Sequence, residues 1–283
     1  MREIVALLAA AASADGVDPV SEPVLLRLRR GRAGEHLLAC DDSGTAGTAG
    51  TLTGYAALDP RADRPTAELA VHPGHRRRGI GTALADAVVE RVGSGLWVWA
   101  HGEHPGALRL AERHGMRRAR ELWQLRRSLA EPIQHRALPD GLRLRAFVPG
   151  QDEPAVVEVN NRAFAWHPEQ AGWEVEQLTE RQEEPWFDPP GFLLAVDHTD
   201  RLLGFHWTKV HPDGTGEVYV LGIDPDAQGT GLGAALTAAG LEHLAGRGLA
   251  EVLLYAESDN DAAVRMYEKV GFRHHRTDVE FFH

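Results

Sequence analysis

Apolar positions follow two different spacings along this chain, and segments of the two kinds alternate. Apolar residues three and four apart predict helices, at residues 4–12, 82–92, 107–113, 153–164, 173–183, 231–245 and 261–270, and a loop followed by a helix at residues 17–30. Runs rich in β-branched and aromatic residues predict strands, at residues 35–40, 51–58, 67–71, 96–100, 142–147, 192–196, 202–212, 216–223 and 251–256. Residues 117–126 and 273–282 are expected to hold two strands each. The pattern predicts an α/β fold (an α+β mixed sheet) with helices on both faces.

An internal repeat determines the expected domain organisation. Residues 71–84 (VHPGHRRRGIGTAL) match residues 223–236 (IDPDAQGTGLGAAL). Further along, residues 96–100 and 107–116 match residues 252–256 and 263–272. Two motifs that recur in the same order indicate a tandem duplication. We therefore expect two tandem domains of one fold, at residues 1–129 and 142–283, joined by a proline-containing linker at residues 130–141.

A glycine-rich loop separates the strand at 216–223 from the helix at 231–245. Gly229, Gly231 and Gly233 let backbone N–H groups approach a ligand at a helix N-terminus, where a pyrophosphate fits. The loop is not a Walker loop, because no Gly-Lys-Ser/Thr follows, and no ribose-binding acid marks a dinucleotide fold. With the preceding strand, Pro225 and Gln228, it resembles the acetyl-CoA loop of the GCN5-related N-acetyltransferase (GNAT) superfamily.

Two residues of the second repeat could supply the acid–base chemistry of acetyl transfer. The attacking amine must lose a proton, and the departing CoA thiolate must gain one. Glu217 is expected to share a strand face with Tyr219 and Leu221, either as a general base or as an exposed carboxylate paired with an arginine. Tyr267 lies in a helix that Asn260 caps, either as a proton donor or as a core residue.

The first repeat lacks this pair of residues. Ala111 stands in place of the tyrosine, and no carboxylate aligns with Glu217. Glu68 is displaced by an odd number of residues and is expected on the other face of its strand. The loop keeps its glycines and adds Arg77 and Arg78, which suit phosphates but could also form an ordinary basic turn. We predict a CoA-binding but non-catalytic first domain.

Charge and cysteine content exclude several classes of partner. The formal net charge of −11 argues against nucleic acids and anionic membrane surfaces as partners. Cys40, the only cysteine, rules out an internal disulfide and a cysteine metal cluster, and we expect it to be a small buried residue. The histidines form no set of zinc ligands, and no apolar run is long enough to span a membrane. We expect a cytoplasmic, monomeric protein without a metal.

Longer blocks of the chain resemble one family within the GNAT superfamily. Residues 15–22, 160–170, 186–189, 202–212, 216–220 and 254–260 closely resemble the mycothiol synthase family. Its members are tandem GNAT proteins that transfer the acetyl group of acetyl-CoA to the cysteinyl amine of cysteinyl-glucosaminyl-inositol, giving mycothiol. The resemblance implies an N-acetyltransferase with a small-molecule acceptor that performs the last step of mycothiol biosynthesis.

The resemblance also implies which residues bind acetyl-CoA. In the second half these would be Leu221, Gly222, Ile223, Gln228, Gly229, Thr230, Gly231, Leu232, Gly233, Ala234, Asn260, Asp261, Ala262, Ala263, Val264 and Arg265. A second acetyl-CoA, which does not react, would be held in the first half by Leu69, Ala70, Val71, Arg77, Arg78, Gly79, Ile80, Gly81 and Thr82. The chain departs from the family pattern at Gly229 and Thr230, where basic residues are more usual.

For the acceptor and the chemistry, the resemblance implies a smaller set of residues. The acceptor would be bound by Glu22, Glu169, Lys209, Glu217 and Tyr255. Glu217 would be the base and Tyr267 the acid, in a direct attack of the amine on the thioester. Because Glu22 belongs to the first half, the acceptor would lie between the halves. Two other functions remain open on the residues alone: acetylation of another small-molecule or protein amine, and a non-catalytic acetyl-CoA-binding regulator.

Overall fold

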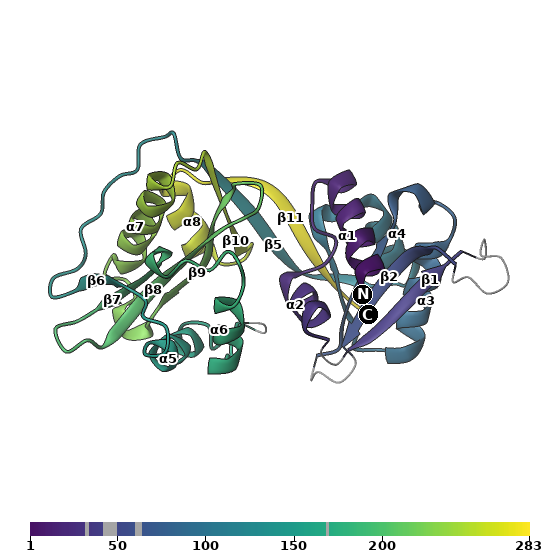
Figure 1. The fold of residues 1–283 in the computed structure, drawn as a ribbon, viewed down its shortest axis with the longest axis horizontal. Coiled ribbons are helices and arrows are strands. Elements are labelled where there is room, and N and C mark those ends of the chain that lie inside the picture. The colour runs from purple at the N-terminus through teal and green to yellow at the C-terminus, as the bar shows by residue number, and fades with distance from the viewer. Residues whose placement is uncertain (32–33, 42–49, 60–63, 168–169) are drawn as a thin grey trace. The chain divides into compact units, whose positions relative to one another are not determined.

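A computed structural model describes residues 1–31, 34–41, 50–59, 64–167 and 170–283, which form two compact units (Figure 1). The first unit comprises Met1–Trp123, Glu257–Asp259 and Arg276–His283, and the second comprises Gln124–Ala256 and Asn260–His275. The end of the second repeat therefore belongs to the first unit. For this reason the compact units do not coincide with the continuous segments 1–129 and 142–283 expected from the repeat.

The first unit is a sheet covered by helices on both faces. Its strands follow the order β1-β2-β3-β4-β11. Their bounds are β1 Glu35–Cys40, β2 Leu52–Asp59, β3 Thr66–Val71, β4 Trp97–Ala100 and β11 Arg273–Phe282. The helices are α1 Arg2–Asp15, α2 Glu22–Arg30, α3 Ile80–Val92 and α4 Pro105–Arg113. Because side chains alternate along β2, Tyr55 and Ala57 pack against α1 and α2, whereas Ala56 and Leu58 pack with α3.

The second unit repeats this arrangement. Its strands follow the order β5-β10-β9-β8-β7-β6, and residues 117–123 of β5 belong to the first unit. Their bounds are β5 Arg117–Ser128, β6 Arg143–Ala146, β7 Phe192–Val196, β8 Leu202–Val210, β9 Gly216–Ile223 and β10 Glu251–Glu257. The helices are α5 Glu153–Ala163, α6 Val175–Gln182, α7 Leu232–Gly246 and α8 Asp261–Lys269. A cluster rich in aromatic residues fills the face under α5 and α6, and Leu232 and Leu236 of α7 pack on the other face.

The predicted mixed α/β fold is confirmed, but three local expectations are wrong. The segments 117–126 and 273–282 each lie within one continuous strand, β5 and β11, because neither contains a turn sequence that would fold it into a hairpin. Cys40 is exposed rather than buried, since it ends β1 at the edge of the sheet. The segment between the strands expected at 35–40 and 51–58 lies mostly outside the described residues, at 42–49.

A buried charged network fastens β11 to the first unit. The His101 ring contacts Asp278 of β11 through Nδ1 at 2.9 Å and Glu68 of β3 through Nε2 at 3.3 Å. The Gly102 N–H also donates to Asp278, at 2.8 Å, and the Ser21 hydroxyl donates to Glu68, at 2.7 Å. Although burial opposes a charged ring, the hydrogen bonds to both carboxylates raise the pKa of His101 to about 10. An imidazolium between two carboxylates therefore joins β11 to β3 and β4.

We expect Asp278→Asn to lower the free energy of unfolding of the first unit by about 3 kcal/mol, because it leaves the buried imidazolium with one carboxylate. Urea unfolding followed by fluorescence of the tryptophans of β4 measures this. The control is Glu112→Gln on the exposed side of α4, which should change nothing. An equal, small effect of both substitutions would contradict the role of the network.

The pH dependence of this contribution has a defined sign. Burial opposes ionisation, but hydrogen bonds from His101 lower the pKa of both Glu68 and Asp278. The stabilisation is therefore lost as the pH falls through these lowered values. It also declines as the pH rises from about 6.5, the usual pKa of histidine, to about 10, where the folded ring loses its proton. Asp278→Asn should make the free energy of unfolding less dependent on pH, both in the acidic range and between about pH 6.5 and 10.

Candidate functional site

The glycine-rich loops of the two units have the same backbone conformation. Arg77 and Gly229 occupy equivalent positions with φ of 64° and 77°, and Gly79 and Gly231 follow with φ of 85° and 91°. The two glycines are the N-caps of α3 and α7. Positive φ at alternate residues turns successive N–H groups toward one side of the loop. The predicted equivalence of the two loops is thus visible in their dihedral angles.

A side chain holds each loop to the end of its preceding strand. Arg76 Nε donates to the carbonyl of Val71, at 3.2 Å, and Gln228 Nε2 donates to the carbonyl of Ile223, at 3.3 Å. Arg76 is held further by two hydrogen bonds of 2.6 Å to Asp15. Within the described part of the chain, no acceptor is found for the backbone N–H groups of residues 77–82 or 229–234. These N–H groups and the helix dipoles form two sites suited to phosphate.

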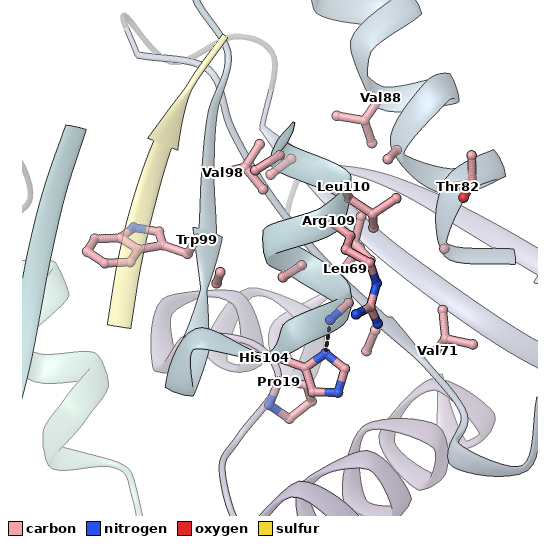
Figure 2. Close-up of a pocket in the computed structure, with 18 of the residues that line it drawn as sticks. Pro19, Leu69, Val71, Thr82, Val88, Val98, Trp99, His104, Arg109 and Leu110 are labelled. Atoms are coloured by element: carbon pink, nitrogen blue, oxygen red, sulfur yellow. Dashed lines mark hydrogen bonds between the residues drawn. The ribbon is translucent and has the colours of Figure 1, made fainter. Parts of the chain in front are cut away.

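In the first unit the loop borders a cavity of about 490 Å³ (Figure 2). This volume lies within the range of about 300–1,000 Å³ typical of small-molecule sites. Of the residues predicted to bind the second acetyl-CoA, Leu69, Ala70, Val71, Arg77, Gly79, Ile80, Gly81 and Thr82 line the cavity. Arg78 is not among its lining residues, and its guanidinium donates to the carbonyl of Gly74. Arg109 and Arg113 of α4, which the sequence analysis did not single out, add positive charge to the wall.

In the second unit, strand β9 carries a bulge just before the loop. The pairing of β8 with β9 shifts register between Trp207 and Thr208, whose partners are Val220 and Val218, so Tyr219 is the extra residue of the bulge. Tyr219 packs on the core under α5 and α6, whereas Leu221 packs against α7. Leu221 therefore does not share a face with Glu217 and Tyr219 as expected, because the extra residue interrupts the alternation.

The first unit has no such bulge. Strand β3 pairs with β2 without a shift. Thr66 of β3 pairs with Trp97 of β4, and this pair is equivalent to the pair of Glu217 in β9 with Leu253 in β10. Thr66 therefore occupies the position of the predicted base. Glu68 lies two residues further on and faces α2, on the equivalent face of the sheet, so its expected placement on the opposite face is wrong. The carboxylate there is already engaged by His101.

Glu217 is buried beside two groups that can donate hydrogen bonds to it. Its Oε2 atom is 2.7 Å from His211 Nε2 and 4.0 Å from Lys209 Nζ. Lys209 is held over the rings of Trp186 and Tyr219, at 4.8 and 4.9 Å from their centroids. Lys209 pairs directly with Glu217 across the β8–β9 ladder. No role was predicted for His211 from the sequence. It follows Lys209 by two residues, and this spacing places both side chains on the same face of the sheet.

Tyr267 lies on the inner side of α8. Asn260 caps this helix by accepting a hydrogen bond from the Ala263 N–H, as predicted. Burial raises the pKa of the Tyr267 phenol, so that it keeps its proton at neutral pH. No hydrogen bond of its hydroxyl is found among the described residues. In the first unit Ala111 lines the cavity at the matching position of α4.

The predicted acceptor residues are distributed over both units. Lys209 and Glu217 are direct neighbours across the β8–β9 ladder. Leu253 of β10 is the partner of Glu217, and Tyr255 lies two residues further on the same face of β10. Gln124 Nε2 donates to the Tyr255 hydroxyl at 2.7 Å. Glu22 begins α2 of the first unit, and Glu169 lies outside the described residues. The roles of these last two residues stay predictions.

Comparison with known proteins agrees with this geometry. The acetyltransferase (GNAT) family matches residues 5–116 and 158–272. The mycothiol acetyltransferase of Saccharopolyspora erythraea is 50% identical over 98% of this chain and 99% of its own, and that of Actinosynnema mirum is 53% identical over 99% and 94%. Two solved structures have the same fold over 99% of this chain. One is a GNAT protein of Sphaerobacter thermophilus, with a TM-score of 0.73 and 26% identity over 90% of that chain. The other is a tandem GNAT protein of the clavulanic acid pathway, with a TM-score of 0.71 and 22% identity over 93% of that chain.

The chain therefore belongs to the GNAT family of acetyltransferases and, within it, to the mycothiol acetyltransferases. It is an N-acetyltransferase with two GNAT regions, and its family implies acetyl-CoA as the acetyl donor. Among the described residues, no group of histidine, cysteine and carboxylate side chains is arranged to hold a metal ion. No described helix has the length and apolar character needed to cross a membrane.

We expect Gly231→Ala to raise the KM for acetyl-CoA about 5- to 30-fold, since alanine strains the backbone at φ 91° by about 1–2 kcal/mol. A Cβ there would contact nothing within 4 Å, so the effect would come from the loop conformation alone. Gly246→Ala, at the other end of α7 and also in open space, is the matched control and should have little effect. The measurement is CoA release at varied acetyl-CoA. A loop variant with an unchanged KM would rule out this phosphate site.

Proposed function

We propose that this chain transfers the acetyl group of acetyl-CoA to the cysteinyl amine of cysteinyl-glucosaminyl-inositol, forming mycothiol. The observation that carries the proposal is a buried carboxylate, Glu217, on the bulged strand that leads into the phosphate-binding loop. A buried carboxylate so near the donor site suits proton removal from an incoming amine. The names of relatives at 50% and 53% identity support mycothiol formation as the reaction.

In this proposal Glu217 is the base and Tyr267 the acid. Glu217 accepts the proton that the amine loses as its nitrogen attacks the thioester carbon. Tyr267 donates its phenol proton to the thiolate that leaves as the carbon–sulfur bond breaks. The phenol of Tyr267 is protonated at neutral pH, as a general acid must be before the thiolate forms. The reaction has no acyl-enzyme intermediate.

The same proposal assigns the acceptor contacts. The acceptor is a polyol that carries an amine, so ammonium and hydroxyl groups must be matched. Lys209 and Tyr255, on the same face as the base, suit the hydroxyl oxygens, and Glu22 and Glu169 suit hydroxyls or the ammonium group. The Lys209 ammonium is fixed by two aromatic rings, which reduces the entropy lost when the acceptor binds.

We further propose that the first unit holds a second acetyl-CoA that does not react. Its loop has the same dihedral angles as that of the second unit, and its cavity carries Arg77, Arg109 and Arg113. Its strand β3 pairs with β2 without a shift, Thr66 stands at the position of Glu217, and Glu68 is engaged by His101. These differences support binding without catalysis. Ala111 leaves a methyl group where the acid would be.

The acceptor is tested by measuring CoA release with cysteinyl-glucosaminyl-inositol, with glucosaminyl-inositol and with cysteine. We expect rapid release only with the complete acceptor, because neither fragment has both the amine and the sugar hydroxyls. Release that is faster with an unrelated amine would assign another substrate. A failure to release CoA with every amine acceptor tried would favour a non-catalytic acetyl-CoA-binding regulator.

The base is tested in the same assay with Glu217→Gln. Loss of the proton acceptor should lower kcat about 10²- to 10⁴-fold while the affinity for acetyl-CoA, measured by calorimetry, stays the same. The control is Cys40→Ala, which should keep full turnover because no acyl-enzyme forms. An unchanged kcat in Glu217→Gln would remove Glu217 from the mechanism.

Calorimetry also tests the second acetyl-CoA. The wild type should bind two molecules per chain. Arg109→Glu in the first unit and Arg265→Glu at the matching position of α8 should each remove one, because the new carboxylate repels phosphate. Only Arg265→Glu should raise the KM for acetyl-CoA. A stoichiometry of one in the wild type would contradict the proposal.

A further inference from the structure

Glu217 has a contact that acid–base chemistry alone does not explain. Its two carboxylate oxygens are in different environments. Oε2 lies 2.7 Å from His211 Nε2 and 4.0 Å from Lys209 Nζ, whereas no donor among the described residues reaches Oε1. The Glu217 side chain is 9% exposed and that of His211 is 28% exposed. One oxygen is thus held by the protein and the other is left for a ligand.

The turn between β8 and β9 determines where His211 lies. The His211 N–H donates to the Thr215 carbonyl at 2.8 Å, and the Gly214 N–H donates to the His211 carbonyl at 2.9 Å. Gly214 has φ of 84°, which allows this tight turn. His211 follows Lys209 by two residues, so it is the diagonal neighbour of Glu217 across the ladder. The turn therefore places the His211 ring within hydrogen-bond distance of the carboxylate oxygen that also faces the Lys209 ammonium.

We propose that His211 is a positioning residue for Glu217: its Nε2–H donates to Oε2 and fixes the carboxylate with Oε1 available to the acceptor amine. The inference rests on the proposed role of Glu217 as the base. A carboxylate with no donor could rotate away from the amine. A hydrogen bond to Oε2 opposes this rotation while leaving the proton-accepting oxygen unoccupied.

The test compares two amides at position 211. The amide nitrogen of glutamine has the same reach as Nε2, whereas that of asparagine corresponds to Nδ1 and is too short. His211→Asn should lower kcat about 10- to 100-fold, the effect of one charge-assisted hydrogen bond, and leave the KM for acetyl-CoA unchanged. His211→Gln should recover most of the loss. His211→Leu, which has no donor, should reproduce the loss seen with asparagine.

A double-mutant cycle with Glu217→Gln identifies the path of the effect. If His211 acts through Glu217, His211→Asn should cost nothing further in the Glu217→Gln background. A further loss of the same size there, or wild-type kcat in both the asparagine and leucine variants, would overturn the inference. An unchanged kcat in Glu217→Gln alone would instead reject the proposed base. The two failures are therefore distinguishable.

Discussion

Backbone N–H groups without an acceptor are costly unless water or a ligand takes their hydrogen bonds, and both units gather several of them at one place. In each unit a strand ends, a loop with alternate positive φ follows, and a helix begins at a glycine N-cap. The side chains of Arg76 and Gln228 hold the loop from the strand side and leave its N–H groups unpaired. The proposed phosphate recognition depends on the backbone, so the same loop conformation is kept in both repeats although the side chains differ.

The units differ in the strand before the loop. One extra residue, Tyr219, shifts the alternation of β9 and places Glu217 opposite Lys209, whereas β3 runs without a shift and has Thr66 at that position. The carboxylate that the first unit does carry on this face, Glu68, is joined to His101 and Ser21. The same face therefore carries the proposed base in one unit and anchors a strand in the other. Each repeat has one such loop, and the bulge distinguishes the repeat in which we propose a base.

Much of this arrangement follows from local sequence. Two GNAT folds and the expected position of acetyl-CoA can be predicted from the repeat, the turn before each loop and the glycines of the loop. Each of these features is a short-range constraint on the backbone. The bulge at Tyr219 could not be predicted, since tyrosine suits a regular strand and only the register against β8 reveals the extra residue. His211 was missed for a similar reason: its contact with Glu217 depends on the length of a turn. The pairing of β11 with β4 joins segments far apart in the sequence, and the alternating pattern of residues 273–282 does not indicate which strand they pair with.

That last pairing has a consequence for how the chain is made. Val279 and Phe281 of β11 complete the sheet and the core of the first unit beside β4 and α4. Synthesis proceeds from the N-terminus, and most domains can fold while the ribosome is still translating the next one. Here β4 has an open edge until Arg276–His283 have been synthesised, so the unit whose synthesis begins first completes its sheet late. Until β11 pairs with β4, this edge is available to other strands and is a site of aggregation in the nascent chain.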